Sequence, residues 1–185
     1  MITKKRAVLQ AIILFAASVN LAHAQAQNGF GLNIGLASHS MEGTVAPSNF
    51  PISYTSSGMS LGLDYQFAIS DSFSVNPFLM SSSESVSGDL NSGTTTGHGI
   101  FGLQARYWIG DLFVGAHVAS YSEVLLNSSN SARDTAGAGT GGGLVVGWEP
   151  SRWSVTGQID SPNLTYSDAD IKLTGIRVNV GYRWK

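Results

Sequence analysis

The sequence predicts an all-β fold, namely a single eight-stranded antiparallel up-and-down transmembrane β-barrel after a cleaved signal peptide. Three observations predict it. The chain begins with the layout of an export signal, the remainder alternates apolar with small or polar residues, and tight turns alternate with longer connections. Alternation with period two is typical of a strand whose two faces meet different surroundings. Short turns at one end and long loops at the other are typical of outer-membrane barrels.

The N-terminal segment is expected to be a signal peptide. A basic start at Lys4, Lys5 and Arg6 precedes an apolar stretch over residues 7–21. Small residues then give a cleavage site after residue 24, with an alternative after residue 26. The expected domains are therefore a signal peptide over 1–24 and a barrel over 25–185. An uncleaved anchor is the alternative, but the apolar stretch is short for a span of about 20 residues.

Composition narrows the class of protein. Charged residues make up 12% of the chain, roughly half of the ~25% of ordinary soluble domains. Cleavage would leave seven basic against twelve acidic residues, a formal net charge of −5, and a nucleic-acid partner is not expected because phosphate binding needs a basic patch. The chain has no cysteine, which excludes disulfides and thiolate chemistry. After the signal no stretch of about 18 apolar residues remains, so no membrane-spanning helix is expected.

Eight segments are predicted to be strands. Their ranges are 29–38, 59–69, 73–80, 99–108, 112–120, 140–148, 153–160 and 172–184. In the second segment every odd position from 59 to 69 is apolar, over a length that a tilted strand needs to cross a bilayer. The third segment is the weakest because Pro77 lacks a ladder donor, so we expect a bulge or an early strand end there.

The fifth segment leaves its facing open. Either Leu112, Val114 and Val118 face lipid and His117 faces inward, or the reverse. We favour the first, since a lipid-facing imidazole would lack partners.

The connections alternate in length. Tight turns are expected at 70–72, 109–111 and 149–152, and longer loops at 39–58, 81–98, 121–139 and 161–171. The loops are rich in Ser, Thr, Asn and Gly. Their acidic residues are Glu42, Glu84, Asp89, Glu123, Asp134, Asp168 and Asp170. Such a surface suits a host or envelope protein, or divalent cations that bridge lipopolysaccharide; the alternative is that the loops are merely soluble and mobile.

Aromatic residues indicate which face meets lipid. The tryptophans and several other rings gather beside the short turns and the C-terminus, where they would form a periplasmic girdle at the lipid–water boundary. These residues are Phe67, Phe73, Tyr107, Trp108, Trp148, Trp153, Tyr182 and Trp184. The girdle favours an apolar outer face. A soluble periplasmic lipocalin-like barrel, with the opposite sense of alternation, is the alternative.

The opposite face is then expected to form a polar network in the barrel interior. Its members are Asp64, Gln66, Gln104, Arg106, Gln158, Asp160, Arg177, Asn179 and Arg183. An eight-stranded barrel is only wide enough for side chains to fill, so a general diffusion pore is not expected. Buried charges must be paired, and we expect the three arginines to bond to the two aspartates and the amides.

The signal, the eight alternating segments and the final strand Ile176–Trp184 resemble the small outer-membrane β-barrel superfamily, which contains the OmpA transmembrane domain, OmpX-like proteins and opacity-type surface proteins. The resemblance implies a monomer in the bacterial outer membrane, in contact with lipid and lipopolysaccharide. It also implies recognition of the C-terminal strand by the barrel-assembly machinery through Tyr182 and Trp184. Lys185 and Asn179 depart from the usual end of that strand.

Signals for chemistry are weak. Residues 137–142 match a dinucleotide fingerprint, but a strand rather than a helix follows them. A lipid A-modifying acyltransferase or deacylase would need an activated serine; Asp160-Ser161, His39 and His98 are the material for it, and the histidines are expected to be solvated loop residues. No histidine pair has metal-ligand spacing, so neither a metal nor a cofactor is expected. The expected function is a non-enzymatic surface protein, structural or adhesive, with the lipid A enzyme and the soluble barrel as alternatives.

Overall fold

The computed structural model describes residues 26–45, 50–88, 94–127, 135–167 and 169–185, and within them the predicted closed antiparallel barrel is confirmed. The predicted signal peptide lies outside the described residues. The strands are β1 (Gly29–Val45), β2 (Phe50–Ser70), β3 (Phe73–Gly88), β4 (Thr94–Ile109), β5 (Leu112–Asn127), β6 (Thr135–Trp148), β7 (Trp153–Thr165) and β8 (Ala169–Trp184). Each strand pairs with its sequence neighbours, and β8 pairs with β1 to close the barrel. In the described part of the chain, no helix is long and apolar enough to cross a membrane.

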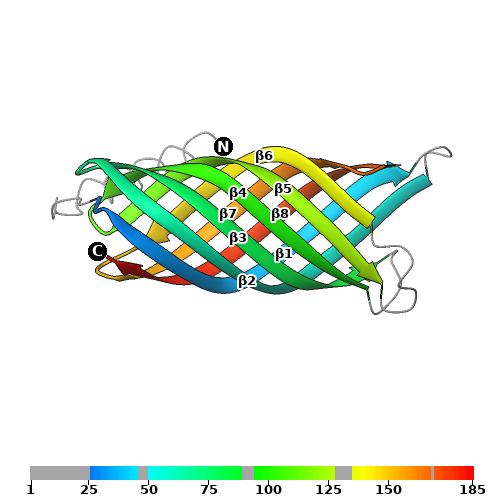
Figure 1. The fold of residues 1–185 in the computed structure, drawn as a ribbon, viewed down its shortest axis with the longest axis horizontal. Coiled ribbons are helices and arrows are strands. Elements are labelled where there is room, and N and C mark those ends of the chain that lie inside the picture. Colours follow the sequence, from blue (N-terminus) through cyan, green and yellow to red (C-terminus); the bar gives the residue numbers. More distant parts are fainter. Residues whose placement is uncertain (1–25, 46–49, 89–93, 128–134, 168) are drawn as a thin grey trace, which may run out of the picture.

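The barrel is elongated, and its strands run obliquely to its long axis (Figure 1). The three predicted tight turns are confirmed, because only short segments separate β2 from β3, β4 from β5 and β6 from β7. Gly110, in the second of these turns, has a φ of 62°, which glycine adopts without steric cost. We call this the turn end of the barrel and the opposite one the loop end.

The prediction of four long loops was wrong, because most of the residues assigned to them belong to strands. β3 continues to Gly88 and β4 begins at Thr94, where the sequence predicted a loop over 81–98. The ladder hydrogen bonds of a closed barrel join backbone groups, so polar side chains do not end a strand. The apolar alternation that identified strands stops earlier because only part of each strand has an apolar outer face.

Pro77 neither ends β3 nor makes the predicted bulge, so that expectation was wrong. Pro77 stays paired with Leu103 of β4, and only the pairing with β2 is interrupted beside it. The register shift between β2 and β3 falls instead at Ala68 and Ser70, next to the turn. The missing donor therefore affects one ladder, while the other keeps the strand in place.

Side chains alternate between the outer wall and the lumen, with the apolar set outside. Leu61 is 55% exposed and Val178 is 53% exposed, whereas Asp64 is buried. In β5, Val114 and Val118 face outward and His117 faces inward, which is the facing that the sequence favoured. This sense of alternation is opposite to that of a soluble barrel, which turns its apolar face inward.

Candidate functional site

The outer wall is divided into two zones along the strands. From the turn end, each strand first presents large apolar residues, which we call the apolar band. The band comprises Phe30–Leu36 on β1, Met59–Ile69 on β2, Leu79 on β3, Phe101–Ile109 on β4, Leu112–Val118 on β5, Leu144–Trp148 on β6, Trp153–Ile159 on β7 and Ile176–Trp184 on β8, taken at their outward positions. A ring of apolar side chains around a closed barrel fits the hydrocarbon core of a bilayer.

Beyond the band, most outward residues bear a hydroxyl group, and we call these residues the hydroxyl collar. Its described members are Ser38, Ser40, Thr44, Ser53, Thr55, Ser57, Ser81, Ser83, Ser85, Ser87, Thr95, Ser120, Ser122, Thr140, Ser161, Thr165 and Thr174. They replace apolar residues on the same outward face of the same strands. Within these strands, the collar therefore continues the barrel wall past the edge of the apolar band.

Seven of the eight predicted girdle residues lie at the turn end with their rings toward the outside or partly exposed. Trp108 is the exception, and its placement in the girdle was wrong. It is 3% exposed, its Nε1–H donates to Ser74 Oγ at 3.0 Å, and its ring packs 4.8 Å from that of Phe113. Trp108 shares the inner face of β4 with Gln104 and Arg106, because residues two apart point to the same side.

The structure buries all nine residues of the expected interior network. Near the turn end, Arg183 donates to Asp64 at 3.0 Å and to Glu149 at 3.1 Å. Arg106 lies 3.8 Å from the same Asp64 carboxylate and donates to the oxygen of Gln104. Two arginines thus face two carboxylates, one of which, Glu149, the sequence placed only in a turn. Opposite charges at this separation offset much of the cost of burial.

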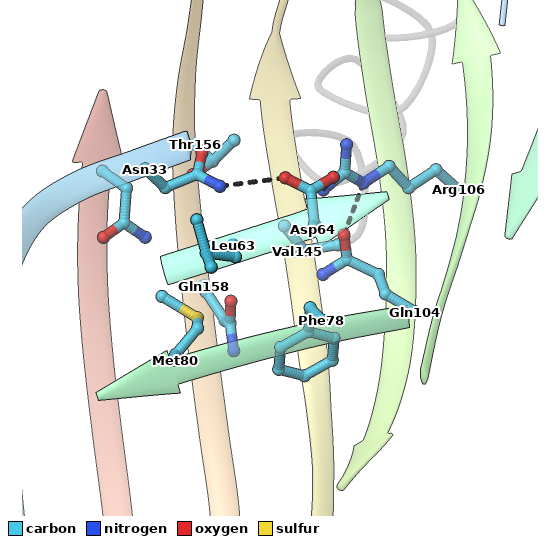
Figure 2. Close-up of a pocket in the computed structure, with 11 residues that line it drawn as sticks. Asn33, Leu63, Asp64, Phe78, Met80, Gln104, Arg106, Val145, Thr156 and Gln158 are labelled. Atoms are coloured by element: carbon cyan, nitrogen blue, oxygen red, sulfur yellow. Dashed lines mark hydrogen bonds and ion pairs between the residues drawn. The ribbon is translucent and has the colours of Figure 1, made fainter. Parts of the chain in front are cut away.

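A small cavity of about 30 Å³ lies in the lumen between Asn33, Asp64, Gln104 and Gln158 (Figure 2). Figure 2 shows the Asn33 amide directed at Asp64 and the Arg106 guanidinium directed at Gln104. A space of this size, lined by polar side chains, is large enough to hold a water molecule. Polar and apolar side chains from several strands project into this space, among them Asp64, Phe78 and Met80.

A second polar group lies further along the lumen, around Asp160. Arg177 donates to its carboxylate, His117 Nε2 lies 2.8 Å from it, and the Tyr121 hydroxyl donates to it at 3.0 Å. Gln158 donates to the same carboxylate at 2.9 Å. The expected bond between Arg177 and Asp160 is present, and His117 and Tyr121 are partners that the sequence did not identify.

The third group contains residues that the sequence assigned to loops. His39, Glu84 and His98 come from β1, β3 and β4 and are all buried in the lumen, so their assignment as loop residues was wrong. Glu84 accepts from Ser56 at 2.5 Å and Ser82 at 2.6 Å, and lies 2.7 Å from His39 Nδ1. Extending the period-two pattern beyond Met80 would have placed Ser82 and Glu84 on the inner face.

Glu123 of β5 is likewise buried rather than exposed in a loop. It accepts hydrogen bonds from Thr96 at 2.7 Å, from Tyr54 at 3.4 Å and from Tyr166. Burial, together with the nearby Glu123 carboxylate, raises the pKa of the Tyr166 hydroxyl above its usual value. The hydroxyl therefore remains protonated and donates.

Apolar side chains close the lumen at the loop end. Met41, Leu164 and Leu173 are almost fully buried and belong to one cluster with Tyr54 and Tyr166. At the turn end, Trp108 and Phe113 pack together in the same way. Apolar clusters and polar groups thus share the lumen along its length.

The suggested catalytic pair does not share a site. Asp160 faces the lumen and its neighbour Ser161 faces outward, since adjacent strand residues point to opposite sides. His39 and His98 also face the lumen, away from Ser161. The glycine-rich segment 137–142 lies within β6, as strand rather than as a phosphate-binding helix start.

No protein-family model matches the chain, and no curated protein matches it. Among solved structures it is similar to Ail, the attachment invasion locus protein of Yersinia pestis, with 14% identity, 85% of this chain and 99% of that chain covered, and a TM-score of 0.48. It is also similar to Ail in complex with the heparin analogue sucrose octasulfate, with 14% identity, coverage of 85% and 99%, and a TM-score of 0.45. The outer membrane protein OprG from Pseudomonas aeruginosa gives 11% identity, coverage of 87% and 98%, and a TM-score of 0.48. At these identities and TM-scores, the similarities carry no argument about what this chain does.

Proposed function

We propose that this chain is an exported outer-membrane surface protein, which is neither an enzyme nor a diffusion pore. The apolar band anchors the barrel in the membrane, and the wall beyond the band presents the hydroxyl collar to the outside. The observation that carries the proposal is the division of one continuous barrel wall into the apolar band and the collar. The band accounts for the membrane anchor, and the filled lumen argues against transport.

The collar supports a structural or adhesive role. Hydroxyl groups offer both donors and acceptors at low charge, which suits contact with the sugars of lipopolysaccharide or with a host or envelope protein. The charged residues that face outward beside the collar include Glu42, Lys172 and Asp170. This mixture is not the basic patch that a polysulfated ligand requires, so binding of a heparin analogue is not part of the proposal.

Cysteine labelling in intact Gram-negative cells tests the orientation, because the chain has no cysteine of its own. Ser85→Cys lies in the collar, Leu103→Cys in the band and Asp71→Cys in a tight turn. A membrane-impermeant maleimide should label Ser85→Cys in intact cells, Asp71→Cys only after permeabilisation, and Leu103→Cys poorly in both. Labelling of Asp71→Cys but not Ser85→Cys in intact cells would overturn the proposed orientation.

Lipid A profiling tests the absence of enzymatic activity. Cells that express the chain and cells that express its Ser161→Ala variant should have the same lipid A mass spectrum as cells without it. A new lipid A species that depends on the chain would contradict the non-enzymatic part of the proposal.

A further inference from the structure

Three lumen side chains have the geometry of a metal site. His39, Glu84 and His98 each offer one ligand atom, and the three atoms lie within 4.8 Å of one another. Glu84 Oε2 is 2.7 Å from His39 Nδ1 and 3.8 Å from His98 Nε2. Two bonds of roughly 2 Å to one zinc-class ion hold their donor atoms roughly 3–4 Å apart. The 3.8 Å between Glu84 and His98 fits this separation, whereas His39 Nδ1, at 2.7 Å, has to move away from Glu84 for the ion to enter.

His98 Nε2 provides a second, independent observation. His98 is 4% exposed, and among the described residues this ring nitrogen has no hydrogen-bond partner. It stands between two carboxylates, 3.8 Å from Glu84 Oε2 and 3.9 Å from Glu123 Oε1, which is too far for hydrogen bonds. Buried polar atoms are almost always satisfied, and an ion held between these groups would satisfy this one.

The balance of charge in the lumen also favours a bound cation. At the turn end, Asp64 and Glu149 face Arg106 and Arg183, so the described charges cancel. Nearer the loop end, Glu84, Glu123 and Asp160 are buried with Arg177, which leaves an excess of two negative charges when all three carboxyls are ionised and the histidines are neutral. A divalent cation would offset both charges, and uncompensated buried charge is costly.

We propose that His39, Glu84 and His98 bind one divalent transition-metal ion of the zinc class, with the Glu123 carboxylate on the far side of His98. Imidazole nitrogen combined with carboxylate oxygen is a ligand set that zinc accepts, whereas calcium and magnesium prefer oxygen alone. Such an ion would join β1, β3 and β4 through the lumen. This inference is independent of the proposed function, because it concerns how the barrel is held together.

Metal binding requires two local changes, of which the first is that the hydrogen bond between His39 Nδ1 and Glu84 Oε2 gives way to the ion. Arg177 Nη2 lies 2.9 Å from His39 Nε2, so that nitrogen now accepts. A neutral imidazole that binds a metal through Nδ1 carries its proton on Nε2, so Arg177 has to leave His39. Its bond to Asp160 remains available.

The test folds the mature barrel in detergent with Zn²⁺ present, because the apolar layer of Met41, Leu164 and Leu173 closes the lumen. After desalting, elemental mass spectrometry should find one zinc per barrel, and Co²⁺ in place of zinc should give the visible absorption of a four-coordinate site. A folded wild-type barrel that retains no zinc would overturn the proposal.

Two variants should lose the metal, and one should keep it. His98→Asn and Glu84→Gln each remove a ligand and should weaken zinc binding by about 100-fold or more, given the sensitivity of metal sites to their surroundings. His117→Asn is the matched control, because His117 is also a buried lumen imidazole but contacts Asp160 rather than Glu84. The mobility of unheated against boiled protein verifies folding, and Glu84→Gln decides the matter if His98→Asn does not fold. Wild-type zinc affinity in a folded ligand variant would overturn the proposal.

Discussion

At the scale of single residues, the buried charges of the lumen depend on their partners. The Asp64 carboxylate pairs with two arginines, since Arg183 donates to it at 3.0 Å and Arg106 lies 3.8 Å away. Removing one partner of a buried ion pair leaves an uncompensated charge, and this is far costlier than losing a pair at the surface.

Asp64→Asn is therefore expected to lower the free energy of unfolding by about 3 kcal/mol. Urea unfolding in lipid vesicles, followed by tryptophan fluorescence, measures it. Glu42→Gln is the control, because Glu42 is exposed on the outer wall and should change stability by less than about 0.5 kcal/mol. Equal effects of the two substitutions on the unfolding free energy would contradict the burial of Asp64 in a charged network.

Gly147 makes room for a ring. It pairs directly with Phe113 across β5 and β6, and a Cβ at this position would overlap the Phe113 ring. Gly147→Ala is expected to destabilise the barrel by about 1–3 kcal/mol through overpacking. Phe113→Leu in the same chain should recover part of the loss, as a double-mutant cycle would measure.

Gly157 is the matched control for this substitution. A Cβ there would meet only Val146 Cγ1, at 3.7 Å, which is an ordinary contact. Gly157→Ala should leave the unfolding free energy nearly unchanged. A loss as large as that of Gly147→Ala would mean that the glycines serve backbone conformation rather than space in the lumen.

At the scale of the strand, each element carries two outer surfaces in succession. In β6, Leu144 lies in the apolar band and Thr140 in the hydroxyl collar, both facing outward. Arginine at the middle of a lipid-facing band costs about 2–4 kcal/mol, and the cost falls to near zero at the interface.

Leu144→Arg should accordingly lower the unfolding free energy in lipid vesicles by about 2–4 kcal/mol, and Thr140→Arg by no more than about 1 kcal/mol. The two substitutions add the same side chain to the same face of one strand, so only depth distinguishes them. Comparable losses at the two positions would place the bilayer boundary elsewhere.

At the scale of the whole molecule, the lumen is closed. Buried side chains from two apolar clusters and three polar groups fill it, and the cavity between Asn33 and Gln158 measures about 30 Å³. In planar lipid bilayers the folded protein should therefore give no steady conductance steps. Regular openings of one size would contradict a filled barrel.

The sequence predicted the fold and the facing well, for one physical reason. Alternation with period two identifies both the strand and its two faces, so the pattern alone is enough to assign Asp64, Arg177 and their partners to the lumen. Trp108 was wrongly predicted to lie in the outer girdle because it is close to a turn. Its position two residues after Arg106 on β4 determines that its ring lies on the inner face. Glu84, Glu123, His39 and His98 were missed because a polar outer face looks like a loop in the sequence.

The sequence by itself determined that the chain forms a closed barrel with an apolar outside, since the repeat of the side chains and the tight turns are local properties. Only the tertiary structure decided how far the strands extend, which charges meet, and that His39, Glu84 and His98 share one site. These three residues are far apart in the chain and lie on β1, β3 and β4, so no spacing in the sequence reports their distance. Closure of the barrel sets that distance, because it fixes the register of each strand against its neighbours and thereby the level at which each inward side chain enters the lumen.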